Sequence, residues 1–181
     1  MNFPLLKTFN VPSSITSILE KTLDQHVNQE GWDNNDIKSC FDERRGYQTY
    51  NLLKWNDEKF KNFTQNELLH LISSHLEIDK SKVSYSWLHF LSYENGGSMK
   101  YHKHWHSEDF VLFIYLKTCS SGKTIFYLND FNENYAKRTH VGILPKKNLA
   151  AIFSSMLLHE GEFCDENKQI FVVGIKVNLI Q

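Results

Sequence analysis

The chain has 181 residues and a formal net charge of −1, a length that suits one domain with a proper core. Acidic and basic residues are scattered, so no basic face favours nucleic acid or an anionic membrane as a partner. No window approaches the roughly twenty apolar residues that span a bilayer, and the N-terminal apolar run is too short for a secretory signal. Cys40, Cys119 and Cys164 form no Cys-x-x-Cys pair, which suits reduced thiols. We therefore expect a single cytoplasmic domain, residues 1–181.

Residues 1–82 are predicted to form a helical support region. Ser13 or Ser14 can cap a first helix, whose apolar face would consist of Ile15, Ile18, Leu19 and Leu23. Thr64–Glu67 matches a capping box, and the second helix would then bury Leu68, Leu69, Leu71, Ile72 and Leu76. Between the two helices, Tyr47–Leu52 is predicted to be an edge strand.

Residues 83–181 carry repeated strand signals separated by turn residues. The predicted strands are Val83–Tyr93, Met99–His104, Phe110–Leu116, Thr124–Leu128, Val141–Leu144, Leu149–Phe153 and Gln169–Leu179. Many short strands of this kind predict an antiparallel barrel or jelly roll. The fold class is therefore mainly β with supporting helices (α+β), in which the N-terminal helices pack on one sheet and the strands form the catalytic core.

Histidines at alternate positions are the main chemical signal. His102 and His104 project from the same face of an extended segment, so both can bind one metal ion. His159 can supply a third ligand from a neighbouring strand. Imidazole nitrogen suits iron, zinc, copper or nickel, and three protein ligands leave coordination positions open. An open site of this kind predicts chemistry rather than a purely structural role.

The chain from Trp87 to Leu179 resembles the double-stranded β-helix, a cupin-like jelly roll, of the iron(II)- and 2-oxoglutarate-dependent oxygenases, and of prolyl-hydroxylase-like members in particular. Four segments carry the resemblance in the family's order: Tyr93–His102, Phe113–Leu116, Ser121–Phe126, and Leu144–Asn148 followed by His159. They are similar to the family's Tyr-x-x-Gly lead to the first ligand, its YYL strand, its Gly-Gly-x-Thr-x-Phe turn and its Pro-x-x-Gly segment before the last ligand.

The resemblance implies that iron(II) and 2-oxoglutarate are the cofactors and that dioxygen is a co-substrate. It places Lys168, nine residues after His159, near the position of the cation that binds the distal carboxylate of 2-oxoglutarate. A dicarboxylate that chelates iron through one end needs such a counter-charge at the other. Tyr115 and Tyr93 are expected to donate hydroxyl hydrogen bonds. Lys168 and Tyr115 also fit simpler interpretations, as a lysine in a turn and as strand packing.

One position departs from the family's His-x-Asp or His-x-Glu pair. The family's spacing aligns His102 with the first ligand and Tyr115 with the YYL strand, so His104 replaces the carboxylate. An alternative register pairs His106 with Glu108, but Tyr115 then follows Glu108 by only seven positions. Glu108 is otherwise an outer partner of a ligand or a fourth ligand. His106 remains an alternative ligand.

The leading hypothesis is an iron(II)/2-oxoglutarate-dependent hydroxylase whose substrate is a protein or peptide side chain, as in prolyl hydroxylases, or a small molecule. A first alternative is a cupin-like dioxygenase or isomerase that uses His102, His104, Glu108 and His159 without 2-oxoglutarate. A second alternative is a non-catalytic barrel that binds a metal or a small ligand. Lys168 separates the leading hypothesis from the cupin-like alternative, because only an enzyme that uses 2-oxoglutarate needs a cation for the distal carboxylate.

Overall fold

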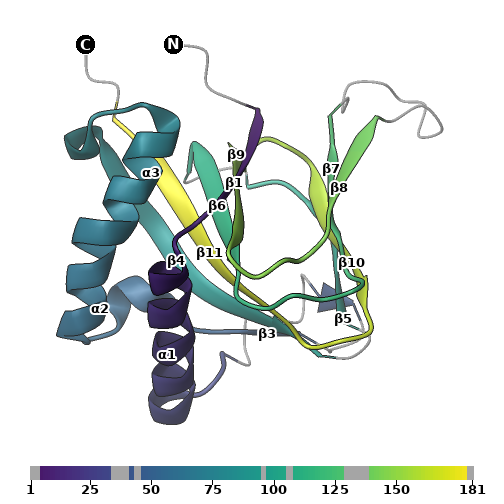
Figure 1. Cartoon of the computed structure of the whole chain (residues 1–181), viewed down its shortest axis with the longest axis horizontal. Helices are drawn as coiled ribbons and strands as arrows, with labels where there is room; N and C mark the ends of the chain where they lie inside the picture. The colour runs from purple at the N-terminus through teal and green to yellow at the C-terminus, as the bar shows by residue number, and fades with distance from the viewer. Residues whose placement is uncertain are drawn as a thin grey trace.

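The computed structural model describes residues 5–33, 41–42, 46–94, 97–104, 108–128 and 139–178. Helices, a larger sheet and a smaller sheet form successive layers (Figure 1). The larger sheet, in the order β1-β9-β6-β11-β4-β3, consists of β1 (Leu6–Asn10), β9 (Leu149–Ser154), β6 (Phe110–Tyr115), β11 (Lys168–Val177), β4 (Val83–Tyr93) and β3 (Gly46–Gln48). The smaller sheet, in the order β2-β5-β10-β7-β8, consists of β2 (Phe41–Asp42), β5 (Gly97–His102), β10 (His159–Cys164), β7 (Thr124–Tyr127) and β8 (His140–Ile143). The described pairs are antiparallel, and the predicted jelly roll is confirmed.

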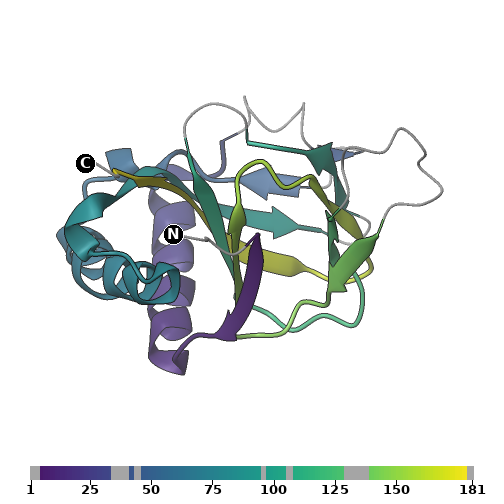
Figure 2. The same ribbon diagram turned by 90° about the horizontal axis from the view of Figure 1, so that it is seen from above.

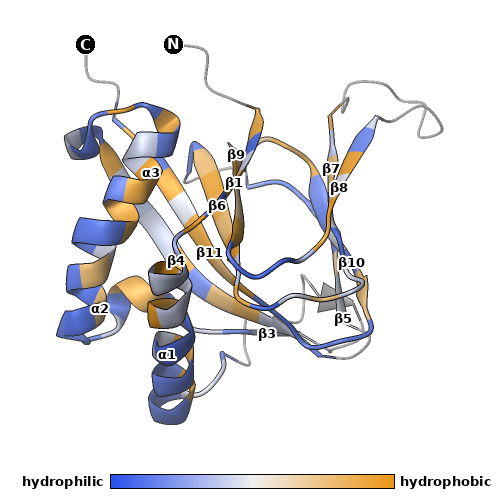
Figure 3. Cartoon of the chain, in the orientation of Figure 1, coloured by the Kyte–Doolittle hydropathy of each residue, from blue (hydrophilic) through white to orange (hydrophobic). Residues whose placement is uncertain are grey.

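The helices cover the outer face of the larger sheet, as the view from above shows (Figure 2). They are α1 (Ser13–Glu30), α2 (Glu58–Phe63) and α3 (Leu69–Leu76), with a π-helical segment η3 (Thr64–Leu68) and short 3₁₀ segments η2 (Leu52–Lys54) and η4 (Lys80–Lys82). Their apolar faces turn toward the strands (Figure 3), where residues such as Leu19, Ile72 and Phe171 are fully buried. A second core lies between the two sheets and contains Phe113, Phe126 and Phe153. Within the described chain, no helix combines the length and the apolar run that crossing a membrane requires.

The predicted strands from Val83 onward are all present, with ends that differ by at most two residues. Three strands were not predicted: β1, β2 and β10. Two of them, β1 and β2, belong to residues 1–82, which therefore contribute strands as well as helices. The edge strand predicted at Tyr47–Leu52 is shorter: β3 ends at Gln48, and Leu52 begins a 3₁₀ turn.

The predicted helix starts are wrong in detail. Pro12 occupies the N-cap of α1, and no side chain caps this helix, so Ser13 and Ser14 are its first helical residues. The second helical region starts before Thr64, because the Asp57 carboxylate caps α2 by accepting a hydrogen bond of 2.7 Å from the Phe60 amide. Starting there buries the aromatic rings of α2 against the sheet, which outweighs the capping box.

A β-bulge changes the orientation of β4 halfway along the strand. Gly174 of β11 pairs with Trp87, but the next pair joins Ile175 with Tyr85, so Ser86 is an extra residue. An extra residue reverses the faces that subsequent side chains take. Tyr85 packs under the helices and Trp87 turns toward the smaller sheet. A Cβ atom on Gly174 would lie 2.5 Å from Cε2 of Trp87, so this position leaves no room for a side chain.

Candidate active site

A cavity of about 370 Å³ lies between the two sheets. Its walls are largely apolar and aromatic, and they come from the inward faces of β4, β6, β9 and β11. The wall residues include Trp87, Leu91, Tyr93, Val111, Phe113, Phe153, Ile170 and Val172. The predicted metal ligands His102, His104 and His159 line the same cavity. Such a mostly apolar space with a small convergent polar group is the usual form of a binding site for a small organic group.

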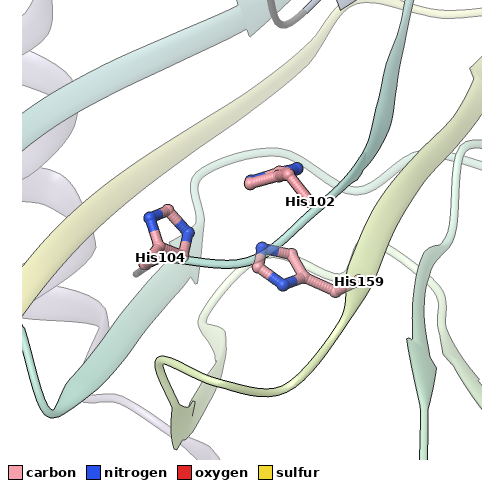
Figure 4. A group of neighbouring side chains, drawn as sticks. All are labelled: His102, His104 and His159. Atoms are coloured by element: carbon pink, nitrogen blue, oxygen red, sulfur yellow. The ribbon is translucent and has the colours of Figure 1, made fainter. Parts of the chain in front are cut away.

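The three histidines gather at one place in the cavity (Figure 4). His102 ends β5 and is the cross-strand partner of His159, which starts β10. His104 follows β5, and its amide donates to the Ser155 carbonyl at 3.0 Å. One candidate ligand atom from each ring lies within 4.8 Å of the others, as a shared ion requires. The structure thus brings together the three residues that the spacing predicts.

Hydrogen bonds orient two of the three imidazole rings. Nδ1 of His102 lies 2.8 Å from the carbonyl of Lys100, and Nδ1 of His159 lies 2.9 Å from the carbonyl of Leu157. Because a carbonyl only accepts, each Nδ1 carries the proton and each Nε2 keeps its lone pair for a metal. Burial lowers the pKa of His102, that of His104 to about 4 and that of His159 well below its usual range. The rings are therefore neutral at pH 7, as metal ligands must be.

Glu108 lies beside His104 rather than in the group of three. Its side chain is 4% exposed, and its Oε1 atom is 3.2 Å from Nδ1 of His104. In this geometry the carboxylate contacts the outer side of the imidazole ring. His106, the alternative ligand of the second register, lies outside the described residues.

Lys168 is fully buried at the start of β11, opposite Tyr93. Its Nζ atom donates to the Gly122 carbonyl at 2.9 Å and lies 4.0 Å from the centre of the Tyr93 ring. Burial lowers the Lys168 pKa to about 8. Within the described part of the chain, no carboxylate forms an ion pair with this amine, so the site suits an anionic ligand. The alternative interpretation, a lysine exposed in a turn, is wrong.

Lys168 and Tyr115 do not line the cavity; they lie directly behind residues that do. The Tyr93 ring covers Lys168, while the Tyr115 hydroxyl lies 2.6 Å from the Thr124 hydroxyl and donates to the Ile143 carbonyl at 3.2 Å. Tyr93 and Thr124 both line the cavity. The three predicted cofactor-binding residues therefore gather at one end, with Tyr93 nearest the open space.

The polar residues of the cavity that were not predicted as site residues include Thr124 and Glu160. Thr124 lies inside the Ser121–Phe126 segment, and the resemblance of that segment to the family's turn could have identified it. Glu160 follows His159 and accepts a hydrogen bond from the Tyr127 hydroxyl. The sequence carries no separate signal for Glu160, because a single glutamate in a strand is ordinary.

No protein-family model matches the sequence, and no curated protein matches it. The fold matches solved structures over nearly the whole chain. A Pseudomonas putida prolyl-4-hydroxylase is 12% identical, with a TM-score of 0.67 and coverage of 95% of this chain and 92% of that one. The viral collagen prolyl hydroxylase of Paramecium bursaria Chlorella virus-1, solved as a 2OG complex, is 16% identical, with a TM-score of 0.60 and coverage of 95% and 96%.

A third match has a different activity. SnoN, a non-heme alpha-ketoglutarate-dependent epimerase from nogalamycin biosynthesis, is 8% identical, with a TM-score of 0.74 and coverage of 96% of this chain and 76% of that one. At these identities the likeness establishes the fold. The chain has the jelly roll of the 2-oxoglutarate-dependent iron oxygenases, a fold that serves hydroxylases and an epimerase alike.

Proposed function

We propose that this protein is an iron(II)- and 2-oxoglutarate-dependent dioxygenase. The observation that carries the proposal is the group of three imidazoles in a cavity of about 370 Å³. His102, His104 and His159 would hold the iron through Nε2. Bound iron and 2-oxoglutarate would supply the oxidising chemistry toward dioxygen, which no side chain of the protein can supply. The aromatic walls would exclude water and hold one substrate carbon near the metal.

Lys168 would bind the distal carboxylate of 2-oxoglutarate. A buried amine with a single carbonyl acceptor keeps further N–H donors for a carboxylate, and a charge-assisted hydrogen bond in a dry pocket is strong. Because Lys168 has no exposed surface, binding requires the Tyr93 ring to move aside. Tyr93, Tyr115 and Thr124 would then offer hydroxyl groups at the same end of the cavity.

The proposed reaction is hydroxylation of a protein or peptide side chain, or of a small molecule. The prolyl hydroxylases of the same fold support the first choice, and the nogalamycin epimerase supports the second. The apolar walls favour a substrate whose reacting carbon belongs to an uncharged group.

A second candidate is a cupin-like metalloenzyme that does not use 2-oxoglutarate. Two observations favour it: the third ligand is His104 instead of a carboxylate, and Lys168 lies behind the cavity wall. Both candidates share the metal site, so they are distinguished by whether the iron-loaded protein binds 2-oxoglutarate.

The test is an anaerobic titration of the iron(II)-loaded protein with 2-oxoglutarate, monitored by the visible charge-transfer band of the chelate. We expect a band in the wild type and a weaker one in His104→Ala. Lys168→Met should require roughly tenfold to 100-fold more 2-oxoglutarate, since a hydrogen bond to a charged group is worth about 1.5–3 kcal/mol. Lys168→Arg should lose less, because it keeps the charge.

Lys123→Met is the matched control, because Lys123 is an exposed cation next to Gly122. It should titrate like the wild type. If the wild type binds iron but develops no band, the cupin-like candidate replaces the oxygenase. If the band forms and is equal in Lys168→Met, the oxygenase stands and the role of Lys168 is wrong.

A further inference from the structure

The position that usually carries the metal-binding carboxylate is His104 here, yet a carboxylate lies next to it. The side chain of Glu108 is almost completely buried, and its Oε1 atom is 3.2 Å from Nδ1 of His104. Burying an ionised carboxylate costs free energy unless a donor compensates. The Nδ1–H group of a neutral imidazole is such a donor, and this pairing leaves Nε2 for a metal.

The pairing distinguishes His104 from the other two ligands. His102 and His159 donate from Nδ1 to backbone carbonyls, which are uncharged acceptors. Of these three rings, His104 alone has a carboxylate oxygen near its Nδ1, at 3.2 Å. A carboxylate acceptor makes the opposite nitrogen a stronger donor to a metal than a carbonyl acceptor does. A hydrogen bond from Nδ1 of His104 to Glu108 would make Nε2 of His104 the strongest electron donor of the set.

The backbone holds the two residues at this distance. Ser155 is buried, and its carbonyl accepts from the His104 amide at 3.0 Å, while its amide donates to the Asp109 carbonyl at 3.1 Å. The Asp109 amide in turn donates to the Ile175 carbonyl at 2.7 Å. His104 and the residue after Glu108 are thus joined to Ser155, which directly follows β9 of the larger sheet. The pair has a built position, unlike a chance contact between two surface side chains.

We propose that Glu108 is a positioning residue that fixes His104 as an Nδ1–H tautomer and supplies, from outside the ligand set, the negative charge that three imidazoles lack. The inference rests on the proposed function, because it assumes that His104 binds the metal. With Glu108 in this role, the site would differ from the two-histidine, one-carboxylate arrangement in one respect. The carboxylate would act through the imidazole ring of His104 instead of binding the ion.

The first test uses the metal-free protein and measures the His104 tautomer by the ¹⁵N chemical shifts of its ring. The wild type should show a proton on Nδ1. Glu108→Ala should shift the population toward a proton on Nε2. Glu108→Gln should keep the Nδ1 proton, since its amide oxygen still accepts, but with a weaker hydrogen bond. Equal spectra in the wild type and Glu108→Ala would overturn the proposal.

The second test measures the affinity for cobalt(II), a spectroscopic substitute for iron(II), by competition with a chelator. Glu108→Ala should bind cobalt about 10-fold to 100-fold more weakly, and Glu108→Gln should lie between it and the wild type. Glu67→Gln, a change at an exposed glutamate on the helical layer, is the control and should match the wild type. Unchanged affinity in both Glu108 variants would overturn the positioning role.

The cobalt spectrum separates an outer partner from a direct ligand. An outer partner leaves the number of protein ligands unchanged in Glu108→Gln, so the visible bands should keep their intensity and shift slightly. A change in coordination number would make Glu108 a ligand and overturn the proposal. If wild-type protein binds cobalt as strongly as a His102→Ala variant, the metal site itself is wrong and the proposed function fails with it.

Discussion

The larger sheet separates two regions of opposite character. On its outer face the helices and strands form a core of aliphatic and aromatic side chains, and this core stabilises the fold. On its inner face the same strands line a cavity that contains three neutral histidines and has the buried Lys168 behind its wall. Burial has opposite uses in the two regions: it supplies stability on one side, and on the other it lowers the histidine and lysine pKa values. Changes in the two regions should therefore have separable effects.

The largest effect is expected from removing a metal ligand. His102→Ala or His159→Ala should weaken metal binding by more than the roughly 100-fold that an outer partner is worth. Thermal unfolding of the metal-free variants should stay close to that of the wild type. Chelator competition measures the affinity, and His70→Ala, at an exposed helix position, is the control. Metal affinity equal to that of His70→Ala would remove these residues from the ligand set.

A substitution in the core beneath the helices should have the opposite effect, lowering stability without weakening metal binding. Phe171 is fully buried and packs against Phe60 and Phe90 with ring centroids 6.5 Å and 5.0 Å away. Phe171→Ala should lower the free energy of unfolding by about 3–5 kcal/mol, because it leaves a cavity. Urea denaturation measures the loss. The folded variant should keep its metal stoichiometry, and loss of metal binding at low temperature, where the protein is folded, would refute the separation of the two regions.

A change on β11 should affect both regions. Gly174→Ala places a Cβ atom against the Trp87 indole, which lies 5.4 Å from the His104 ring. We expect a loss of about 1–3 kcal/mol in stability from overpacking, together with weaker binding of metal. The double variant Gly174→Ala/Trp87→Leu should recover part of the stability, as a thermodynamic cycle by denaturation will measure. Strict additivity would mean that the two residues do not clash.

The smallest effect concerns pH and lies on the helical side. His26 is 2% exposed, packs edge-on against Trp55, and neither ring nitrogen has a hydrogen-bond partner among the described residues. Burial lowers its pKa, and Glu30 partly opposes this. The unfolded chain therefore takes up a proton near pH 6.5 before the folded chain does, so stability falls as the pH drops below about 6.5.

His26→Leu should remove this part of the pH dependence and stabilise the protein by about 1 kcal/mol, because no unpaired polar atom remains buried. Urea denaturation at pH 5 and pH 7.5, in both proteins, gives the difference that belongs to His26. The ligand histidines titrate in both proteins and cancel. Parallel pH profiles would show that His26 does not contribute.

The sequence predicts most of this architecture because alternation and spacing are local signals. His102 and His104 share a strand face, and the strands from Val83 onward alternate or form apolar runs. β10 was missed because its exposed positions carry Glu162 and Phe163 instead of a regular polar pattern. The Glu108 contact was one of several open alternatives, since only the folded chain places its carboxylate on the outer side of His104.

Ser86, the extra residue of the β-bulge, reverses which face of the sheet the alternating side chains of β4 occupy. Before it, odd-numbered residues such as Tyr85 face the helices; after it, even-numbered residues such as Phe90 do, and the odd-numbered Tyr93 faces the smaller sheet. Because of this one inserted residue, the odd-numbered positions of β4 pack against the helices before Ser86 and face the cavity after it. Deletion of this one serine should therefore disturb the site more than substitution of any single side chain before it.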